Sequence, residues 1–133
     1  RTRLITSFGV FSSANSENTI ALLKAGICRY GKPKSVMTDH GSTYYANHPN
    51  ADQGNVPFRI TLDALGIKHY VARVNRPQTN GKVERFFLSY KTEYATGTFS
   101  NVGDYIRHYN EARPHMSLGY RTPRQVWDEM KSV

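Results

Sequence analysis

Apolar residues recur at intervals of three and four along much of the chain, which is the spacing of one face of an α-helix. The segments that show this spacing are residues 16–30, 58–65 and 80–96, a stretch around 102–109 that stops before Pro114, and a last stretch from Thr122. The last one begins with a threonine cap, Pro123 at the first helical position and Gln125 at the third, a pattern typical of a helix start. The sequence therefore predicts several amphipathic helices.

These stripes also predict which side chains are buried. On residues 80–96 and on the last helix, we expect the buried faces to consist of Val83, Phe86, Phe87, Tyr90 and Tyr94, and of Val126, Trp127 and Met130. Cys28, the single cysteine, has no partner for an intramolecular disulfide and is expected to be a core residue. The presence of a single cysteine fits a reducing, intracellular location such as the cytoplasm.

Three other segments have the composition of strands rather than helices. Residues 3–11 are rich in β-branched and aromatic residues, 35–38 form a short apolar run, and 67–72 alternate between apolar and polar positions. Strands and helices thus alternate, which predicts an α/β fold with a mixed or largely parallel sheet and flanking helices. Such sheets place their functional sites at strand ends and in the loops beyond them.

Charge and loop composition narrow the range of partners. The chain of 133 residues carries a formal net charge of +8, which favours an anionic partner such as nucleic acid. No apolar run approaches the roughly 20 residues that a membrane span needs. One domain is the working expectation at this length, and the polar segment 40–56 predicts a long loop of the kind that often carries function.

Two acidic residues stand out as candidates for chemistry. Asp39 follows the expected buried strand 35–38, so the sheet would hold it in place while leaving it open to a ligand; an ordinary turn aspartate is the alternative. Glu84 lies near the start of the helix 80–96, and Lys91 lies two turns further along the same face. A solvated helix face is the alternative interpretation there.

Several short motifs occur in one order along the chain. They are Thr38-Asp39-His40-Gly41, Gly66-Ile67-Lys68-His69, Arg76-Pro77-Gln78-Thr79-Asn80-Gly81-Lys82-Val83-Glu84-Arg85-Phe86-Phe87, Tyr109-Asn110-Glu111-Ala112-Arg113-Pro114-His115 and Leu118-Gly119-Tyr120-Arg121-Thr122-Pro123. Together they resemble the catalytic core of DDE-type transposases and retroviral integrases, and the last two resemble the closing segment of insertion-sequence transposases. The resemblance covers nearly the whole chain and implies a prokaryotic mobile element.

The resemblance implies a ribonuclease H-like fold and metal-dependent cutting and joining of DNA strands. Members of this family hold two divalent metal ions, Mg²⁺ or Mn²⁺, with three acids, and ions about 4 Å apart suit displacement at phosphorus. By motif, Asp39 matches the second acid and Glu84 the third, while Lys91 matches a basic residue that contacts the terminal DNA. The interval of 84 − 39 = 45 positions exceeds the retroviral one, and the excess falls in the loop 46–57.

DNA is the partner that the resemblance implies, together with further copies of the chain. Basic residues gather in sequence around Glu84, where they would contact phosphates: Arg73, Arg76, Lys82, Arg85 and Lys91. Tyr44 could stack on splayed bases, although buried tyrosine is the commoner case. Zinc is disfavoured, because His40, His69 and His115 lack metal-binding spacing.

No residue here matches the family's first acid, which lies on the first strand of its sheet. We therefore expect residues 1–133 to be a partial core that lacks its first strand or strands, and to be inactive in DNA joining by itself. Two other functions remain open. One is an inactive nucleic-acid-binding remnant, and the other is a ribonuclease H-like nuclease, since one fold hosts many functions.

Overall fold

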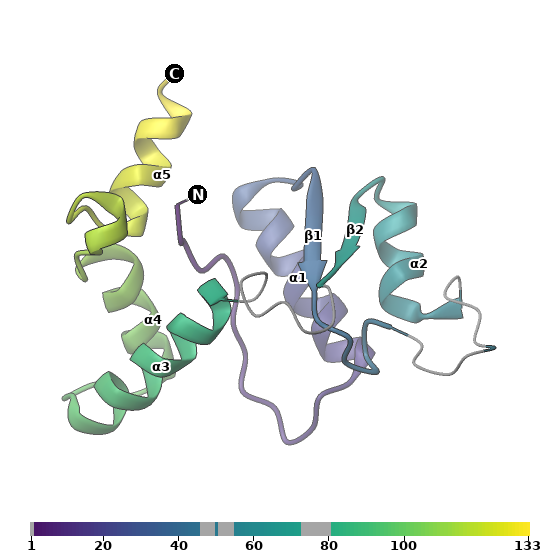
Figure 1. Cartoon of the computed structure of the whole chain (residues 1–133), viewed down its shortest axis with the longest axis horizontal. Coiled ribbons are helices and arrows are strands. Elements are labelled where there is room, and N and C mark those ends of the chain that lie inside the picture. The colour runs from purple at the N-terminus through teal and green to yellow at the C-terminus, as the bar shows by residue number, and fades with distance from the viewer. Residues whose placement is uncertain (1, 46–49, 51–54, 73–80) are drawn as a thin grey trace. The chain divides into compact units, whose positions relative to one another are not determined.

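The computed structural model describes residues 2–45, 50, 55–72 and 81–133 (Figure 1). These residues form two compact units, one made of Thr6–Asn80 and the other of Arg1–Ile5 with Gly81–Val133. In chain order the elements are α1 (Ser16–Tyr30), β1 (Ser35–Thr38), α2 (Pro57–Ala64), β2 (Lys68–Val71), α3 (Gly81–Thr96), α4 (Val102–Glu111), the 3-10 helix η3 (Met116–Leu118) and α5 (Pro123–Lys131). The mixed α/β class with a small sheet and flanking helices is confirmed.

The Thr6–Asn80 unit is built around a parallel pair of strands. Strands β1 and β2 pair in the register Ser35↔Lys68 to Thr38↔Val71, and α2 lies in the connection between them. Four buried side chains, Val56, Phe58, Leu62 and Ile67, form the core, and residues of α1 and β1 pack against it. Because parallel strands end at the same edge, this unit fixes where the residue after β1 emerges.

The expected strand over residues 3–11 is wrong, because these described residues form neither helix nor strand. A strand needs a neighbouring backbone for its hydrogen bonds, which β-propensity alone does not supply. At Ile5 a side chain takes that place: Asn110 Oδ1 accepts from the Ile5 N–H at 2.9 Å, and Asn110 Nδ2 donates to the Ile5 carbonyl at 2.9 Å. The Asn110 amide is buried and ties this segment to α4.

The other unit has an aromatic core between α3 and α4. Tyr105, Ile106 and Tyr109 of α4 are buried, and Phe86, Tyr90 and Tyr94 of α3 pack against them together with Phe99. Helix α5 begins with the predicted capping box, in which Thr122 accepts from the Gln125 N–H while the Gln125 side chain accepts from the Thr122 N–H. These local signals fix where the helices begin.

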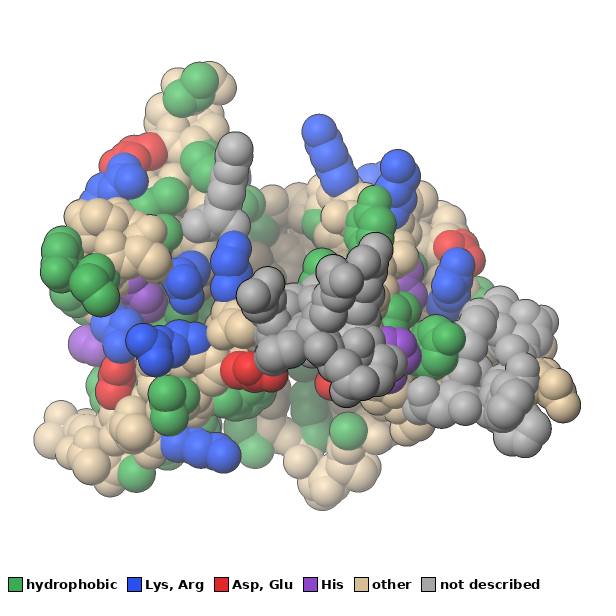
Figure 2. All heavy atoms as spheres, in the orientation of Figure 1, with side chains coloured by type: hydrophobic (Ala, Val, Ile, Leu, Met, Phe, Trp, Pro, Cys, Tyr) green, Lys and Arg blue, Asp and Glu red, His purple; other side chains and the backbone are tan. Residues whose placement is uncertain are grey.

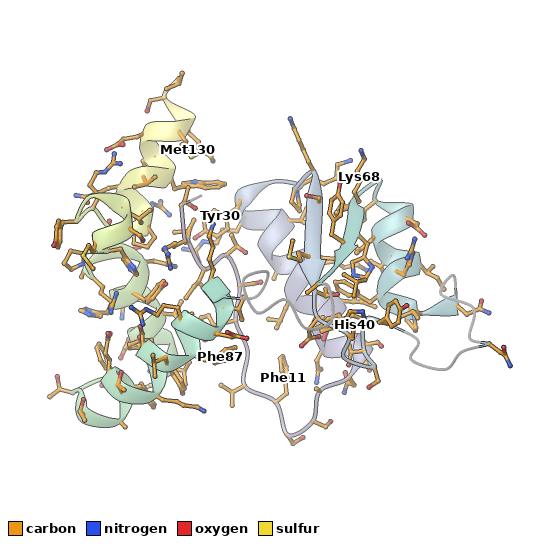
Figure 3. All side chains as sticks on the ribbon, in the orientation of Figure 1. Phe11, Tyr30, His40, Lys68, Phe87 and Met130 are labelled. Carbon is orange, nitrogen blue, oxygen red and sulfur yellow. The ribbon has the colours of Figure 1, made fainter. Side chains whose placement is uncertain are left out.

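Several side chains expected in the core are exposed instead. Val83 of α3 is 56% exposed. Phe87 of α3 and Met130 of α5, both labelled in Figure 3, are 53% and 47% exposed. Cys28 is exposed as well, because it lies one position past Ile27, one of the residues of α1 that pack on the core. One residue corresponds to about 100° around a helix, which turns its side chain away from the face of its neighbour.

Among the described residues, none of the helices is both long and apolar enough to cross a membrane.

Candidate functional site

Asp39 directly follows β1, and its carboxylate is held in a tight turn. Its Oδ1 accepts a hydrogen bond from the backbone N–H of Gly41 at 2.9 Å, while the side chain as a whole is exposed. A Cβ added at Gly41 would lie 3.0 Å from that same oxygen, so a larger residue would force the carboxylate to shift. The Asp39-His40-Gly41 motif thus orients an acid at the C-terminal end of β1.

Thr38 at the end of β1 and His69 on the neighbouring strand β2 support the backbone at Asp39. The Thr38 hydroxyl donates to the Asp39 carbonyl at 3.0 Å and lies 2.9 Å from His69 Nε2. Because the hydroxyl proton is used in the first contact, Nε2 carries the proton that completes the second. Burial and the charge of Arg59 lower the pKa of His69, which favours this neutral ring. Sequence reasoning weighed His69 only for zinc. The signal for its role is the register that places it opposite Val36 on β1, two residues before Thr38.

Glu84 lies in the first turn of α3, where the helix dipole favours a negative charge. Its side chain is exposed, as are those of Lys82, Arg85 and Lys91 on the same helix. Lys91 lies seven residues on, so it follows Glu84 along one face, as the sequence predicted. Arg85 lies about 100° further around the helix and belongs to a neighbouring face.

The two candidate acids belong to different units, Asp39 to Thr6–Asn80 and Glu84 to the unit of α3, α4 and α5. Their shared role in metal binding therefore stays a prediction. Arg73 and Arg76 lie outside the described residues. Tyr44 is half-buried, and its ring packs edge-on against Phe58 at 5.0 Å between centroids, so part of its surface is already used in the core.

No group of three histidine, cysteine or acidic residues capable of holding a metal occurs within the described part of the chain. Each of the three histidines weighed for zinc contacts a different residue. His40 packs against Tyr45, His69 contacts Thr38, and His115 packs against Tyr109.

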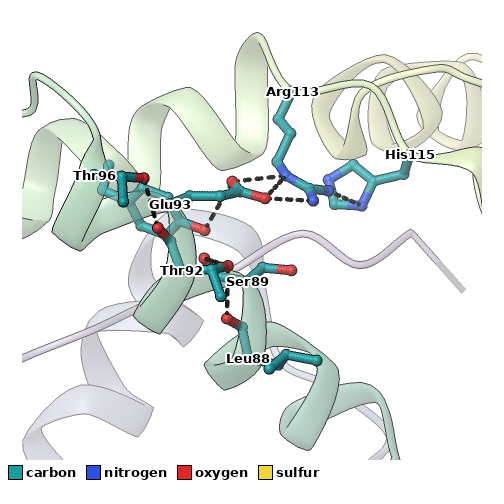
Figure 4. Close-up of polar contacts among 8 residues, drawn as sticks. Leu88, Ser89, Thr92, Glu93, Thr96, Arg113 and His115 are labelled. Carbon is teal, nitrogen blue, oxygen red and sulfur yellow. Dashed lines mark hydrogen bonds and ion pairs between the residues drawn. The ribbon is translucent and has the colours of Figure 1, made fainter.

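A polar cluster that sequence reasoning missed joins α3 to the segment after α4 (Figure 4). Arg113 donates from Nε and from a terminal nitrogen to the Glu93 carboxylate, the shortest contact being 2.6 Å, and the Tyr105 hydroxyl donates to the same group at 3.3 Å. These contacts, led by the Arg113 hydrogen bond, lower the pKa of Glu93. Arg113 also lies 3.4 Å from His115 Nδ1, and burial followed by the Arg113 charge lowers the pKa of His115. The only available signal was the Arg113-Pro114-His115 motif.

The lowered pKa of Glu93 predicts a pH-dependent contribution to stability. Its carboxylate is ionised more readily when folded, so the Arg113 pair contributes fully above the unfolded value of 4.5 and loses its contribution as the pH falls through the folded pKa. Glu93→Gln should therefore lower the free energy of unfolding at pH 7, by at most about 1 kcal/mol for a pair that is still partly exposed to solvent. At pH 3 the difference from the unsubstituted protein should shrink.

Fluorescence of Trp127, the single tryptophan, during urea unfolding gives the measurement, because this residue lies on α5 in the same unit. Glu129→Gln is the matched control, since Glu129 pairs with Arg121 on the surface, where such pairs contribute little. An equal loss for Glu93→Gln at both pH values would contradict the assignment.

Basic side chains are prominent on the unit that contains α3, where Figure 2 shows lysine and arginine side chains gathered over α3 and α4. Those near Glu84 in sequence, Lys82, Arg85 and Lys91, are all exposed. An exposed group of cations beside an exposed acid suits a phosphodiester that is approached by metal ions.

Comparison with known proteins identifies the family that part of the chain matches. Residues 65–123, which include Glu84, Lys91 and the cluster around Arg113, match the integrase core domain family. This segment belongs to that family. The resemblance that the motifs indicated is therefore confirmed.

Two curated relatives extend the integrase core match over more of the chain. A protein of Spiroplasma virus SpV1-C74 named as integrase ORF3 is 30% identical over 139 aligned positions, which cover 92% of this chain and 38% of that protein. The transposase InsD for insertion element IS2 of Escherichia coli is 32% identical over 101 positions, or 70% of this chain and 31% of that protein. The chain thus spans less than half the length of these relatives.

The fold has a solved counterpart. A chain in the cryo-EM structure of the simian T-cell lymphotropic virus intasome, in complex with the PP2A regulatory subunit B56 gamma, aligns with a TM-score of 0.64. The alignment covers 88% of this chain and 41% of that chain, at 20% identity. At this identity the likeness concerns the fold.

Proposed function

We propose that this integrase core chain is part of the catalytic core of a DNA transposase or integrase, which cuts DNA and transfers strands with the help of divalent metal ions. One observation carries the proposal: the acids that match the family motif, Asp39 and Glu84, both stand exposed at the boundary of a regular element. An acid so placed is held by the fold and open to metal and DNA.

The proposed architecture is a partial ribonuclease H-like core that spans residues 1–133. The described elements supply a strand, helix, strand and helix in the order β1, α2, β2 and α3. The likeness to a chain of the intasome structure supports this assignment. We further propose that the chain acts in the cytoplasm as a homo-oligomer on element ends and target DNA.

The donor groups suit Mg²⁺ or Mn²⁺, which prefer carboxylate oxygen over sulfur ligands. Asp39 uses Oδ1 in its turn with Gly41, and Glu84 contributes a carboxylate at the start of α3. When bound, such ions activate the attacking oxygen and stabilise the leaving one at phosphorus. The chain's own contribution is to place each carboxylate at the boundary of a regular element, Asp39 after β1 and Glu84 in the first turn of α3.

The cations of α3 would hold the DNA backbone. Lys91 lies on the same face as Glu84, and Lys82 and Arg85 flank that face. Arg73 and Arg76 belong to the same proposed set, and Tyr44 retains a half-exposed ring for contact with a base. Contacts of this kind supply affinity for any DNA sequence.

Lys91→Ala should weaken binding of the chain to duplex DNA several-fold and reduce its salt dependence. Loss of one phosphate contact lowers the slope of log affinity against log salt by about 0.9 for B-DNA. Fluorescence anisotropy with a labelled duplex at several salt concentrations measures both quantities. Lys131→Ala removes an equal charge from α5 and should have a smaller effect. An affinity that changes neither with salt concentration nor on Lys91→Ala would contradict the DNA-binding part of the proposal.

A further inference from the structure

A pocket of about 300 Å³ lies within the unit that contains α3, away from the face of Glu84 and Lys91. Its wall combines α3, the N-terminal segment, α4 and the chain that follows α4. The lining residues are Arg3, Arg85, Ser89, Tyr109, Arg113, Pro114, His115, Met116 and Ser117. All of them belong to the same compact unit, so the unit itself defines the pocket.

The pocket is strongly cationic. Three of its lining residues are arginines and none is acidic. Glu93, behind the wall, pairs with Arg113 and offsets one charge, which leaves Arg3 and Arg85 with no acidic neighbour in the wall. Ser89 and Ser117 add hydroxyl groups that can donate hydrogen bonds to an anion.

The two faces of α3 separate this pocket from Glu84, the proposed metal ligand on that helix. Arg85 and Ser89 are four residues apart and line one side of the helix, and Glu93 continues the same line. Glu84 and Lys91 follow a second line about 100° away. One helix thus presents an acid on one face and an anion-binding wall on the next.

The fold holds Arg3 in an uncommon conformation. Its φ of 59° lies in the left-handed region, which costs a non-glycine residue about 1 kcal/mol or more. Two positions further along, Ile5 hydrogen-bonds to Asn110 through both its N–H and its carbonyl, and Arg3 shares the pocket wall with Tyr109. A strained residue held by its surroundings points to function rather than to chance.

The rest of the wall is ordered before any ligand arrives. Glu93 fixes Arg113, and Tyr109 packs edge-on against His115 at 4.6 Å. His115 is buried, and its Nε2 has no hydrogen-bond partner in the described residues. A preformed cationic wall binds an anion without a large ordering cost.

We propose that this pocket binds one phosphate group of the DNA backbone, gripped by Arg3 and Arg85 beside the Ser89 and Ser117 hydroxyls. The inference rests on the proposed function, which supplies DNA as the anion. Guanidinium groups match phosphate oxygens with paired hydrogen bonds, and a pocket without acids favours an anion of this charge. The site would anchor DNA on the face of α3 next to that of Glu84.

The test measures affinity of the 133-residue chain for a labelled 30-base-pair duplex as salt is varied. Arg3→Gln and Arg85→Gln should each weaken binding about tenfold, which is the loss of about 1.4 kcal/mol expected for a charge-assisted contact. The double variant should lower the slope of log affinity against log salt by about 0.9, the value for one phosphate, rather than by twice that. Arg107→Gln, an exposed cation on α4 outside the pocket, is the matched control and should change affinity little.

Other outcomes separate the inference from the function on which it rests. If Lys91→Ala weakens binding while the pocket variants and Arg107→Gln behave alike, the pocket inference is wrong and the proposed function stands. A slope change near 1.8 in the double variant would mean two separate phosphates and would also overturn it. If the chain shows no salt-sensitive DNA binding at all, the proposed function itself fails. Unfolding followed by Trp127 fluorescence verifies that each variant is folded.

Discussion

Replacing Glu84 by glutamine should lower the rate of DNA nicking and joining at least about a hundredfold. Loss of a second-shell contact to a metal ligand commonly costs 10 to 100-fold, and removal of a ligand charge should cost no less. Glutamine keeps the size and hydrogen-bonding capacity of glutamate, and Glu84 is exposed on α3, so the fold should be spared. The assay is magnesium-dependent nicking of DNA that carries the element's ends, by a protein in which residues 1–133 are joined to a segment that carries the family's first acid.

Two further variants sharpen this result. Asp39→Asn should cause a loss of similar size, because it removes the matching charge after β1 without removing the Oδ1 acceptor that Gly41 uses. Glu111→Gln is the matched control, since Glu111 is an exposed acid at the end of α4 and has no proposed role. Full activity of Glu84→Gln would show that the assignment by motif is wrong.

Tyr105→Ala should cost about 3 to 5 kcal/mol of stability in the unit of α3, α4 and α5. Tyr105 is fully buried, and its ring lies within 6.5 Å of Tyr90, Phe99 and Tyr109 between centroids. Truncation would open a cavity at the centre of the aromatic core, and losses of this size approach the whole stability of a small domain. The measurement is urea unfolding followed by the fluorescence of Trp127.

Two control variants separate the stability contributed by packing of the Tyr105 ring from that of its hydroxyl hydrogen bond. Tyr105→Phe keeps the packing and loses only the 3.3 Å bond to Glu93, which still has Arg113, so the cost should be about 1 kcal/mol or less. Tyr120→Ala removes an equal ring that is 70% exposed and should cost under about 0.5 kcal/mol. A small loss for Tyr105→Ala would show that the aromatic core does not hold this unit together.

Local signals in the sequence predicted most of the helices and two of the strands. The capping box of Thr122 and Gln125 needs only neighbouring residues, and it is present as expected. The apolar run of β1 and the stop at Gly31, whose φ is 90°, are local in the same sense. Features fixed within one turn of the chain are therefore readable without knowledge of the fold.

Features that depend on a distant partner were not readable. The segment 3–11 has the composition of a strand, but Ile5 hydrogen-bonds to Asn110, which is 105 positions away. Likewise, the stripe on α3 showed which residues share a face, but not that Val83 and Phe87 would be half exposed. Burial depends on what packs against a face, and periodicity carries no information about that neighbour.

The candidate site divides in the same way. Asp39 and Glu84 were identified by motif, and the turn in which the Gly41 N–H donates to Asp39 is local. The support from His69 and the pairing of Glu93 with Arg113 each join residues 20 or more positions apart, so spacing gave no signal for them. Arg3, at the other end of the chain from the Arg113 segment, could not be linked to the cationic pocket before the fold was known.

The central claim is that this integrase core family member supplies two acids for metal-dependent DNA strand transfer. Its most direct test is joining of labelled element ends to target DNA by residues 1–133 joined to a segment that carries the family's first acid. The assay is run with Mg²⁺, with Mn²⁺ and with a chelator, and with Glu84→Gln alongside. We predict joined products with either metal and none with the chelator or the variant. Salt-sensitive DNA binding without any nicking or joining would contradict the claim and indicate an inactive binding protein, and cleavage restricted to RNA strands would indicate a ribonuclease H-like nuclease instead.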